Sequence, residues 1–109
     1  MNNEVTMIHL ASEKTNSALS TFTDDQVQPN AIDLRIDKLF KINNSQFAIS
    51  EEGKTHRGSV EMPPDKDGFW SLYPGTYEII MEGTVKLGEN EAGWVITRST
   101  LNRNGAFIT

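Results

Sequence analysis

Apolar and polar positions alternate along several short stretches of this chain, most regularly over residues 77–87. The odd positions of that stretch carry apolar side chains, namely Tyr77, Ile79, Met81, Val85 and Leu87. Most even positions are polar, and a period of two places successive side chains on opposite faces of a strand. Gly83 falls on the apolar side of this register, where it predicts a bulge or a break between two strands. The stretch is therefore predicted to form β structure.

A second alternating stretch, residues 31–36, follows Pro29 and carries apolar side chains at each even position. Proline pushes the residue before it toward extended geometry, which favours a strand that begins just after Pro29. Asp33 and Arg35 would then lie side by side on the polar face of this strand. One interpretation of Asp33 is that it simply pairs with Arg35 or with another cation on that face.

Shorter apolar runs predict further strands at residues 39–42, 46–49 and 94–97. The loop Asn43-Asn44-Ser45 has a composition that suits a tight hairpin between the first two of these strands. Residues 88–93, with the sequence GENEAG, are predicted to form a turn before the third.

The remaining segments are mostly polar. Residues 50–67 are predicted to be an irregular, exposed connection, and the apolar cluster at residues 5–10 predicts a short helix or an edge strand. Several short strands separated by Gly and Pro, with little helix, predict an all-β sandwich or jelly roll. A length of 109 residues allows one domain. We divide it into an N-terminal extension, residues 1–26, and a β core, residues 27–109.

Charge and composition narrow the possible functions. Ten Lys and Arg against fifteen Asp and Glu give a net charge of −5, which argues against a broad basic face for duplex nucleic acid. The chain has no Cys, so disulfides, thiolate nucleophiles and cysteine-rich zinc sites are excluded. No apolar run approaches the ~18 residues of a membrane span, and the first ten residues lack the basic start of a signal peptide. We expect a soluble cytoplasmic protein that does not bind membranes.

The densest group of candidate functional residues is RSTLNRNG, residues 98–105. Arg98 and Arg103 offer paired hydrogen bonds to phosphate oxygens, while the hydroxyls of Ser99 and Thr100 and the backbone amides of a turn add further donors. This spacing suits a cradle for a polyphosphate. Two alternatives stay open, namely an ordinary surface loop and salt bridges to a neighbouring subunit.

Other candidate residues favour structural roles. His9 and His56 are far apart in sequence and are expected to be solvated rather than to bind metal. Trp70 and Trp94 flank predicted strands, where large aromatic side chains usually fill the core or a subunit contact. Acidic pairs in predicted loops are expected to be solvated charge, namely Asp24-Asp25, Glu51-Glu52 and Asp65-Lys66-Asp67.

Three segments together resemble one known superfamily. They are VQPNAIDLRI, residues 27–36, then LYPGTYEI, residues 72–79, and RSTLNRNG, residues 98–105. Their order and approximate spacing are similar to those of the superfamily that joins deoxyuridine triphosphatases (dUTPases) with deoxycytidine triphosphate (dCTP) deaminases. The first segment resembles the deaminase branch especially closely, and the third is a pattern that both branches share.

This resemblance implies a distorted jelly-roll subunit of the dUTPase-like β-clip type, assembled as a homotrimer with active sites at subunit boundaries. It implies a deoxynucleoside triphosphate ligand, dUTP or dCTP, and Mg²⁺ as cofactor. Carried over by position, Arg98, Ser99 and Thr100 would contact the phosphate chain. Arg103 would be a second basic residue of the kind found in the deaminases. Asp33 matches the first-motif acid, which in the triphosphatases supports the water network around Mg²⁺.

The leading functional hypothesis is hydrolysis of dUTP to dUMP and pyrophosphate. The alternatives are metal-free deamination of dCTP to dUTP and a non-catalytic module of the same fold that binds a nucleotide or a regulatory partner. The family pattern continues beyond Gly105 into a third motif that holds the water-activating acid. We therefore expect either the front part of a longer enzyme, incomplete at its C-terminus, or a relative without catalysis.

Overall fold

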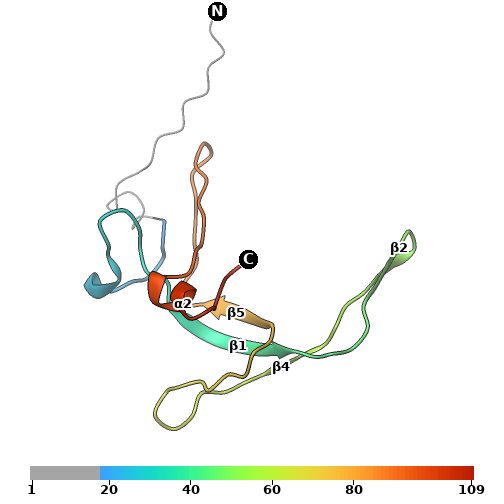
Figure 1. Cartoon of the computed structure of the whole chain (residues 1–109). Helices are drawn as coiled ribbons and strands as arrows, with labels where there is room; N and C mark the ends of the chain where they lie inside the picture. The colour runs from blue at the N-terminus through green and yellow to red at the C-terminus, as the bar shows by residue number, and fades with distance from the viewer. Residues whose placement is uncertain (1–17) are drawn as a thin grey trace, which may run out of the picture.

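The computed structural model describes residues 18–109, and its regular structure is mostly β strand (Figure 1). The elements in chain order are η1 (Asp24–Gln26), β1 (Ile36–Ile42), β2 (Ala48–Ser50), β3 (Gly53–Thr55), β4 (Ser59–Glu61), β5 (Tyr77–Met81) and α2 (Ser99–Arg103). The all-β prediction is confirmed, since the helical segments within residues 18–109 are a 3-10 turn and one short α-helix. The apolar cluster at residues 5–10 lies outside the described part of the chain.

The largest sheet has three strands in the order β4-β1-β5, with β1 antiparallel to both neighbours. Its register sets Leu39 opposite Ile79 and Phe40 opposite both Glu61 and Glu78. β1 is rich in branched and aromatic side chains, which suit a strand that packs on two neighbours. Its pairing with β5 shifts register between residues 36 and 38, at one end of the strand.

β2 and β3 form a separate two-stranded sheet, which projects away from the larger sheet (Figure 1). Ala48 pairs with Thr55 and Ser50 with Gly53. The predicted hairpin between residues 39–42 and 46–49 is therefore wrong, because β2 pairs with the strand that follows it and not with β1. The prediction of an irregular segment over residues 50–67 is wrong in part, because β3 and β4 both lie within it.

The predicted strand at residues 31–36 is also wrong, because β1 begins only at Ile36. The chain instead turns back on itself: the N–H of Gln28 donates to the carbonyl of Ala31 at 3.0 Å, and Val27 and Ile32 form an isolated bridge. Local hydrogen bonds thus satisfy backbone groups that a strand would offer to a neighbour.

The predicted β structure at residues 77–87 is confirmed only up to Met81, where β5 ends. Gly83 follows with φ of 77°, a left-handed conformation that glycine adopts readily and that breaks the strand at the predicted position. Val85 then forms a single bridge with Leu19. The predicted turn at residues 88–93 is confirmed by the hydrogen bond from Glu91 N–H to the carbonyl of Gly88.

The core of the described residues is small. Leu39 in the central strand is 2% exposed and Leu19 is 6% exposed, and Gln26 is the other buried side chain among residues 18–109. The predicted strand at residues 94–97 is absent, and Trp94 is 78% exposed, so of its two predicted roles the core of this chain is wrong and a subunit contact stays a prediction. Trp70 is partly buried, and its Nε1 donates to the carbonyl of Met62 at 2.7 Å.

In the part of the chain that the structure describes, no helix combines the length and the apolar character that crossing a bilayer requires.

Candidate functional site

Asp33 is held by hydrogen bonds from the segment that precedes it. Its backbone N–H donates to the carbonyl of Gln26 at 2.7 Å, and its own carbonyl accepts from the Gln26 side-chain Nε2 at 2.8 Å. The Nε2 of Gln28 donates to the carboxylate Oδ2 at 3.1 Å. These contacts with Gln26 and Gln28, which the sequence does not predict, fix both the backbone and the carboxylate of Asp33.

Gln26 is the residue that joins this network to the rest of the chain. It ends η1, is 5% exposed, and its Oε1 accepts from the backbone N–H of Thr23 at 2.9 Å. A Thr followed three residues later by Gln is the spacing of a capping box, so this sequence signal could have revealed the position of Gln26. The capping turn places a buried amide where it can hold Asp33.

The fold brings Asp33 beside Arg98, from opposite ends of the described chain. The Nη1 of Arg98 lies 3.3 Å from the Oδ2 of Asp33, with the two side chains 72% and 22% exposed. The pairing of Asp33 with Arg35, one of the sequence interpretations, does not form, because Arg35 pairs with Asp25 instead. Arg98 is thus oriented by a carboxylate but still open to solvent.

Asp25 and Arg35 form the second ion pair near this turn. Its carboxylate accepts a hydrogen bond from the Thr23 hydroxyl and pairs with the Arg35 guanidinium. The Thr23 hydrogen bond is the main cause that lowers the pKa of Asp25 from its ordinary value, and the charge of Arg35 lowers the pKa further. Both partners favour the ionised carboxylate, so Asp25 engages Arg35 and leaves Asp33 to Arg98.

The RSTLNRNG segment forms a helical turn. Arg98 is the extended N-cap residue of α2, and its carbonyl accepts from the N–H of Asn102 at 3.1 Å. The helix ends before Gly105, whose φ of 80° is a left-handed conformation typical of a helix C-terminus. The sequence predicts a turn in this segment, and the structure shows a short helix there.

The helix separates the predicted phosphate ligands. Ser99 and Arg103 are four residues apart and share one face of α2, whereas Thr100 lies about 100° further round. All three are exposed. Arg103 forms no ion pair within residues 18–109, so Arg98 is the predicted ligand that the fold brings to Asp33.

A metal site built from protein ligands alone is not found in the described region, where no three Asp, Glu or His side chains gather closely enough. His56 is exposed, and His9 lies outside the described residues. The oxygen of Asp33 that faces Arg98 and Gln28 is Oδ2, and within residues 18–109 Oδ1 makes no hydrogen bond or ion pair. One carboxylate oxygen together with substrate phosphates is a donor set of the kind that Mg²⁺ uses.

A family model described as dCTP deaminase-like matches residues 3–109 of the chain. The chain belongs to the dCTP deaminase-like family. This finding confirms the superfamily that the three sequence segments resemble, and with it the all-β dUTPase-like fold.

Curated relatives of this dCTP deaminase-like chain come from both branches. It is 34% identical over 90 residues to the probable deoxyuridine 5'-triphosphate nucleotidohydrolase of Halobacterium salinarum, covering 78% of this chain and 54% of the relative. It is 29% identical over 103 residues to the dUMP-forming dCTP deaminase of Bifidobacterium animalis, covering 90% and 52%. A deoxyuridine 5'-triphosphate nucleotidohydrolase of Methanocaldococcus jannaschii is 33% identical over 87 residues, covering 78% and 56%.

The chain therefore spans about half the length of the curated relatives it matches. No solved structure matches it. The relatives and the family model together support a role in nucleotide metabolism.

Proposed function

We propose that this chain carries the triphosphate-binding residues of a dUTPase-like hydrolase that converts dUTP to dUMP and pyrophosphate. The observation that carries the proposal is the Arg98 side chain, which is 72% exposed while its Nη1 lies 3.3 Å from Asp33. A guanidinium has five N–H donors, so one contact with Asp33 leaves others for phosphate oxygens. The similarity to a relative named as a dUTP nucleotidohydrolase supports dUTP as substrate.

In the proposed reaction, a water oxygen forms a bond to the α-phosphorus. The bond from that phosphorus to the bridging oxygen breaks, pyrophosphate leaves with the electron pair, and the water gives up a proton. The protein contributes positioning and charge neutralisation. Arg98 and Ser99 hold the phosphate chain, and Arg103, which shares one face of α2 with Ser99, adds a second cation.

Asp33 has two proposed roles. Its Oδ2 orients Arg98, and its Oδ1, together with substrate phosphate oxygens and water, would hold Mg²⁺. When bound, this ion neutralises charge on the phosphates. Because Gln26 and Gln28 fix Asp33 before any ligand arrives, the carboxylate does not have to be ordered on binding.

Deamination of dCTP is the second candidate. In that reaction water adds to C4 of the cytosine ring, the bond from C4 to the amino nitrogen breaks, and ammonia leaves. The description of the matching family, the dUMP-forming dCTP deaminase among the relatives, and Arg103 at a position typical of deaminases all favour it. The chain's own residues would hold the triphosphate in the same way in either reaction.

A homotrimer is the assembly that we propose for either function. Large apolar side chains are exposed along the C-terminal half of the described chain, among them Tyr73, Trp94, Ile96 and Phe107. A large exposed apolar patch is unusual on a soluble monomer and is typical of subunit contacts. Light scattering coupled to size exclusion tests this part of the proposal, since a mass of one chain at micromolar concentration would contradict it.

The decisive experiment incubates the complete protein that contains this chain with dUTP or dCTP and Mg²⁺ while pyrophosphate and ammonia are followed, with binding of each nucleotide measured by calorimetry. Pyrophosphate from dUTP supports the hydrolase. Ammonia without pyrophosphate would replace it with the deaminase. Tight binding of dUTP without product would make the chain a non-catalytic binding module, and no binding at all would remove the whole proposal.

A matched pair of variants tests the residue that carries the proposal. Arg98→Gln removes charge-assisted hydrogen bonds worth roughly 1.5–3 kcal/mol, so dUTP affinity is expected to fall about 10- to 100-fold. Lys86→Gln makes the same charge change at another exposed position and is expected to have no such effect. Equal affinities for the two variants would exclude Arg98 as a phosphate ligand.

A further inference from the structure

Two adjoining hollows lie at the Ile42 end of β1, next to the residues that precede β4 and β5. Their volumes are about 370 and 380 Å³, and they share Ile42, Arg57 and Thr76 in their walls. Volumes of this size are typical of small-molecule sites. The first hollow is also lined by Lys41, Asn43 and Asn44, so its wall is dominated by hydrogen-bond donors.

Among residues 18–109, the two cations of this wall have no acidic partner. The ion pairs within residues 18–109 are those of Arg35 and Arg98, and neither Lys41 nor Arg57 takes part in one. Each cation instead lies over an aromatic ring. The Lys41 Nζ is 4.7 Å from the centre of the Tyr77 ring, and the Arg57 Cζ is 5.2 Å from that of Phe47.

An aromatic face attracts a cation but does not cancel its charge. It also leaves the N–H groups of the cation available at its edge, where they can donate to a ligand. In a chain of net charge −5, two cations without acidic partners beside one hollow are a local concentration of positive charge. The first hollow therefore favours an anion.

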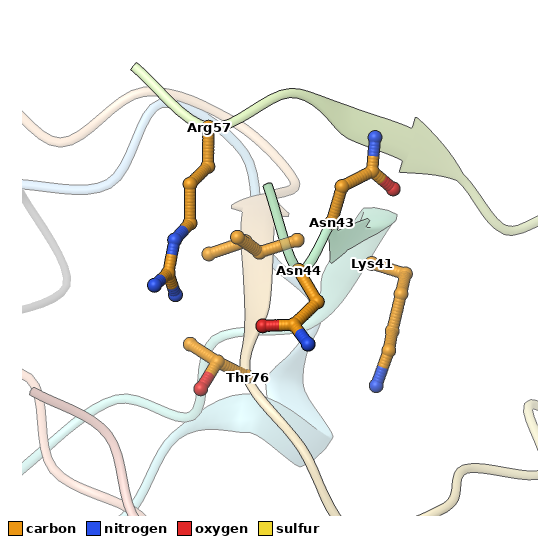
Figure 2. Close-up of a pocket in the computed structure, with 6 residues that line it drawn as sticks. Lys41, Asn43, Asn44, Arg57 and Thr76 are labelled. Carbon is orange, nitrogen blue, oxygen red and sulfur yellow. The ribbon is translucent and has the colours of Figure 1, made fainter. Parts of the chain in front are cut away.

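Neutral donors line the same space. Figure 2 shows Arg57, Asn44 and Thr76 around one opening, with Lys41 on the far side of Asn44. Glu78 and His56 line only the second hollow. Because a carboxylate at Glu78 repels an anion, the favoured position for one lies in the first hollow, among Lys41, Asn44 and Arg57.

This hollow is separate from the site around Asp33. It lies at the Ile42 end of β1, while Arg35 and Asp33 precede the opposite end. Seven residues of strand span about 20 Å at ~3.3 Å per residue, which is too far for one phosphate group to contact both Arg57 and Arg98.

From these observations we propose a second anion site, formed by Lys41, Asn44, Arg57 and Thr76, that binds a phosphate group. The two guanidinium N–H edges of Arg57 match the spacing of phosphate oxygens, and the Lys41 ammonium adds a point charge. The phosphate can belong to free pyrophosphate or to a nucleotide. The proposal does not depend on the function assigned to Arg98.

The test is a titration of the full chain carrying Arg98→Gln, which removes the first proposed phosphate ligand. Pyrophosphate and dUMP are the probes, and backbone amide shifts in NMR spectra locate the binding. Shifts centred on Asn44 and Thr76 are expected with pyrophosphate. Adding Arg57→Gln is expected to weaken binding about 10- to 100-fold, as the loss of charge-assisted hydrogen bonds requires. Lys41→Gln is expected to weaken binding independently.

Lys54→Gln is the matched control, because Lys54 is exposed on β3 and lines neither hollow. Equal pyrophosphate affinity in the Arg57→Gln and Lys54→Gln proteins would overturn the proposal, as would shifts that do not map to the first hollow. If dUMP binds more tightly than pyrophosphate and shifts Phe47 as well, the source is a nucleotide. If pyrophosphate binds more tightly than dUMP, the site takes the free anion.

Discussion

Replacing Gln26 by Leu is the perturbation that most directly tests how the chain holds Asp33. Gln26 is 5% exposed, and its side-chain amide links the Thr23 backbone N–H to the Asp33 carbonyl. Leu has nearly the same volume, so the substitution leaves no large cavity. It removes one acceptor and one donor at once, so both backbone groups lose their partner.

The magnitude follows from these two bonds. Each contributes roughly 0.5–1.5 kcal/mol net, and a buried polar group left without a partner costs roughly 1–3 kcal/mol. Thr23 is exposed, so water can replace the acceptor that its N–H loses, whereas Asp33 is partly buried. We therefore expect a total loss of about 2 kcal/mol in the free energy of unfolding.

Urea unfolding followed by circular dichroism measures this loss. With a denaturant slope of about 2 kcal/mol per molar, the midpoint of the Gln26→Leu protein is expected to fall by about 1 M. Gln46→Leu is the control, because Gln46 is exposed and the substitution makes the same chemical change outside the hydrogen-bond network of Asp33. If the two variants unfold at the same urea concentration, Gln26 does not hold Asp33 and this reasoning is wrong.

Three further measurements test the charges and the helix end. Because the pKa of Asp25 is lowered in the fold, its ionised carboxylate stabilises the protein at pH values above about 4, and this contribution is lost as the pH falls through the folded pKa. In the Thr23→Val protein, an NMR titration should show that the pKa of Asp25 rises. A double-mutant cycle of Asp33→Asn and Arg98→Gln is expected to give a coupling of at most about 1 kcal/mol, because Arg98 is 72% exposed; a much larger coupling would mean that the pair is shielded from water. Gly105→Ala places a Cβ at a residue with φ of 80°, where no other atom crowds it. Backbone strain alone is expected to lower the free energy of unfolding, measured with urea, by about 1 kcal/mol. An unchanged urea midpoint would mean that the turn adopts another conformation.

The candidate site was predicted in its parts but not in its arrangement. Arg98 is predicted because a guanidinium suits phosphate oxygens, and Asp33 is predicted because it matches the acid of the family's first motif; both depend on residue type, which is fully visible in the sequence. Their contact depends on how a turn near the start of the described chain meets a helix near its end. Arg35 illustrates the limit of prediction from sequence, because alternation predicts that it lies beside Asp33, whereas in the structure it forms an ion pair with Asp25.

By itself, the sequence determined the all-β class, the family, the end of the strand before Gly83 and the turn at residues 88–93. These features depend on residue type and on neighbours along the chain, such as the backbone freedom of glycine. The tertiary structure alone decided that β1 pairs with β4 and β5, that Arg98 meets Asp33, and that Trp94 stays exposed. The physical reason is that alternation is a local property, whereas strand partners and ion pairs depend on contacts between residues far apart in the chain.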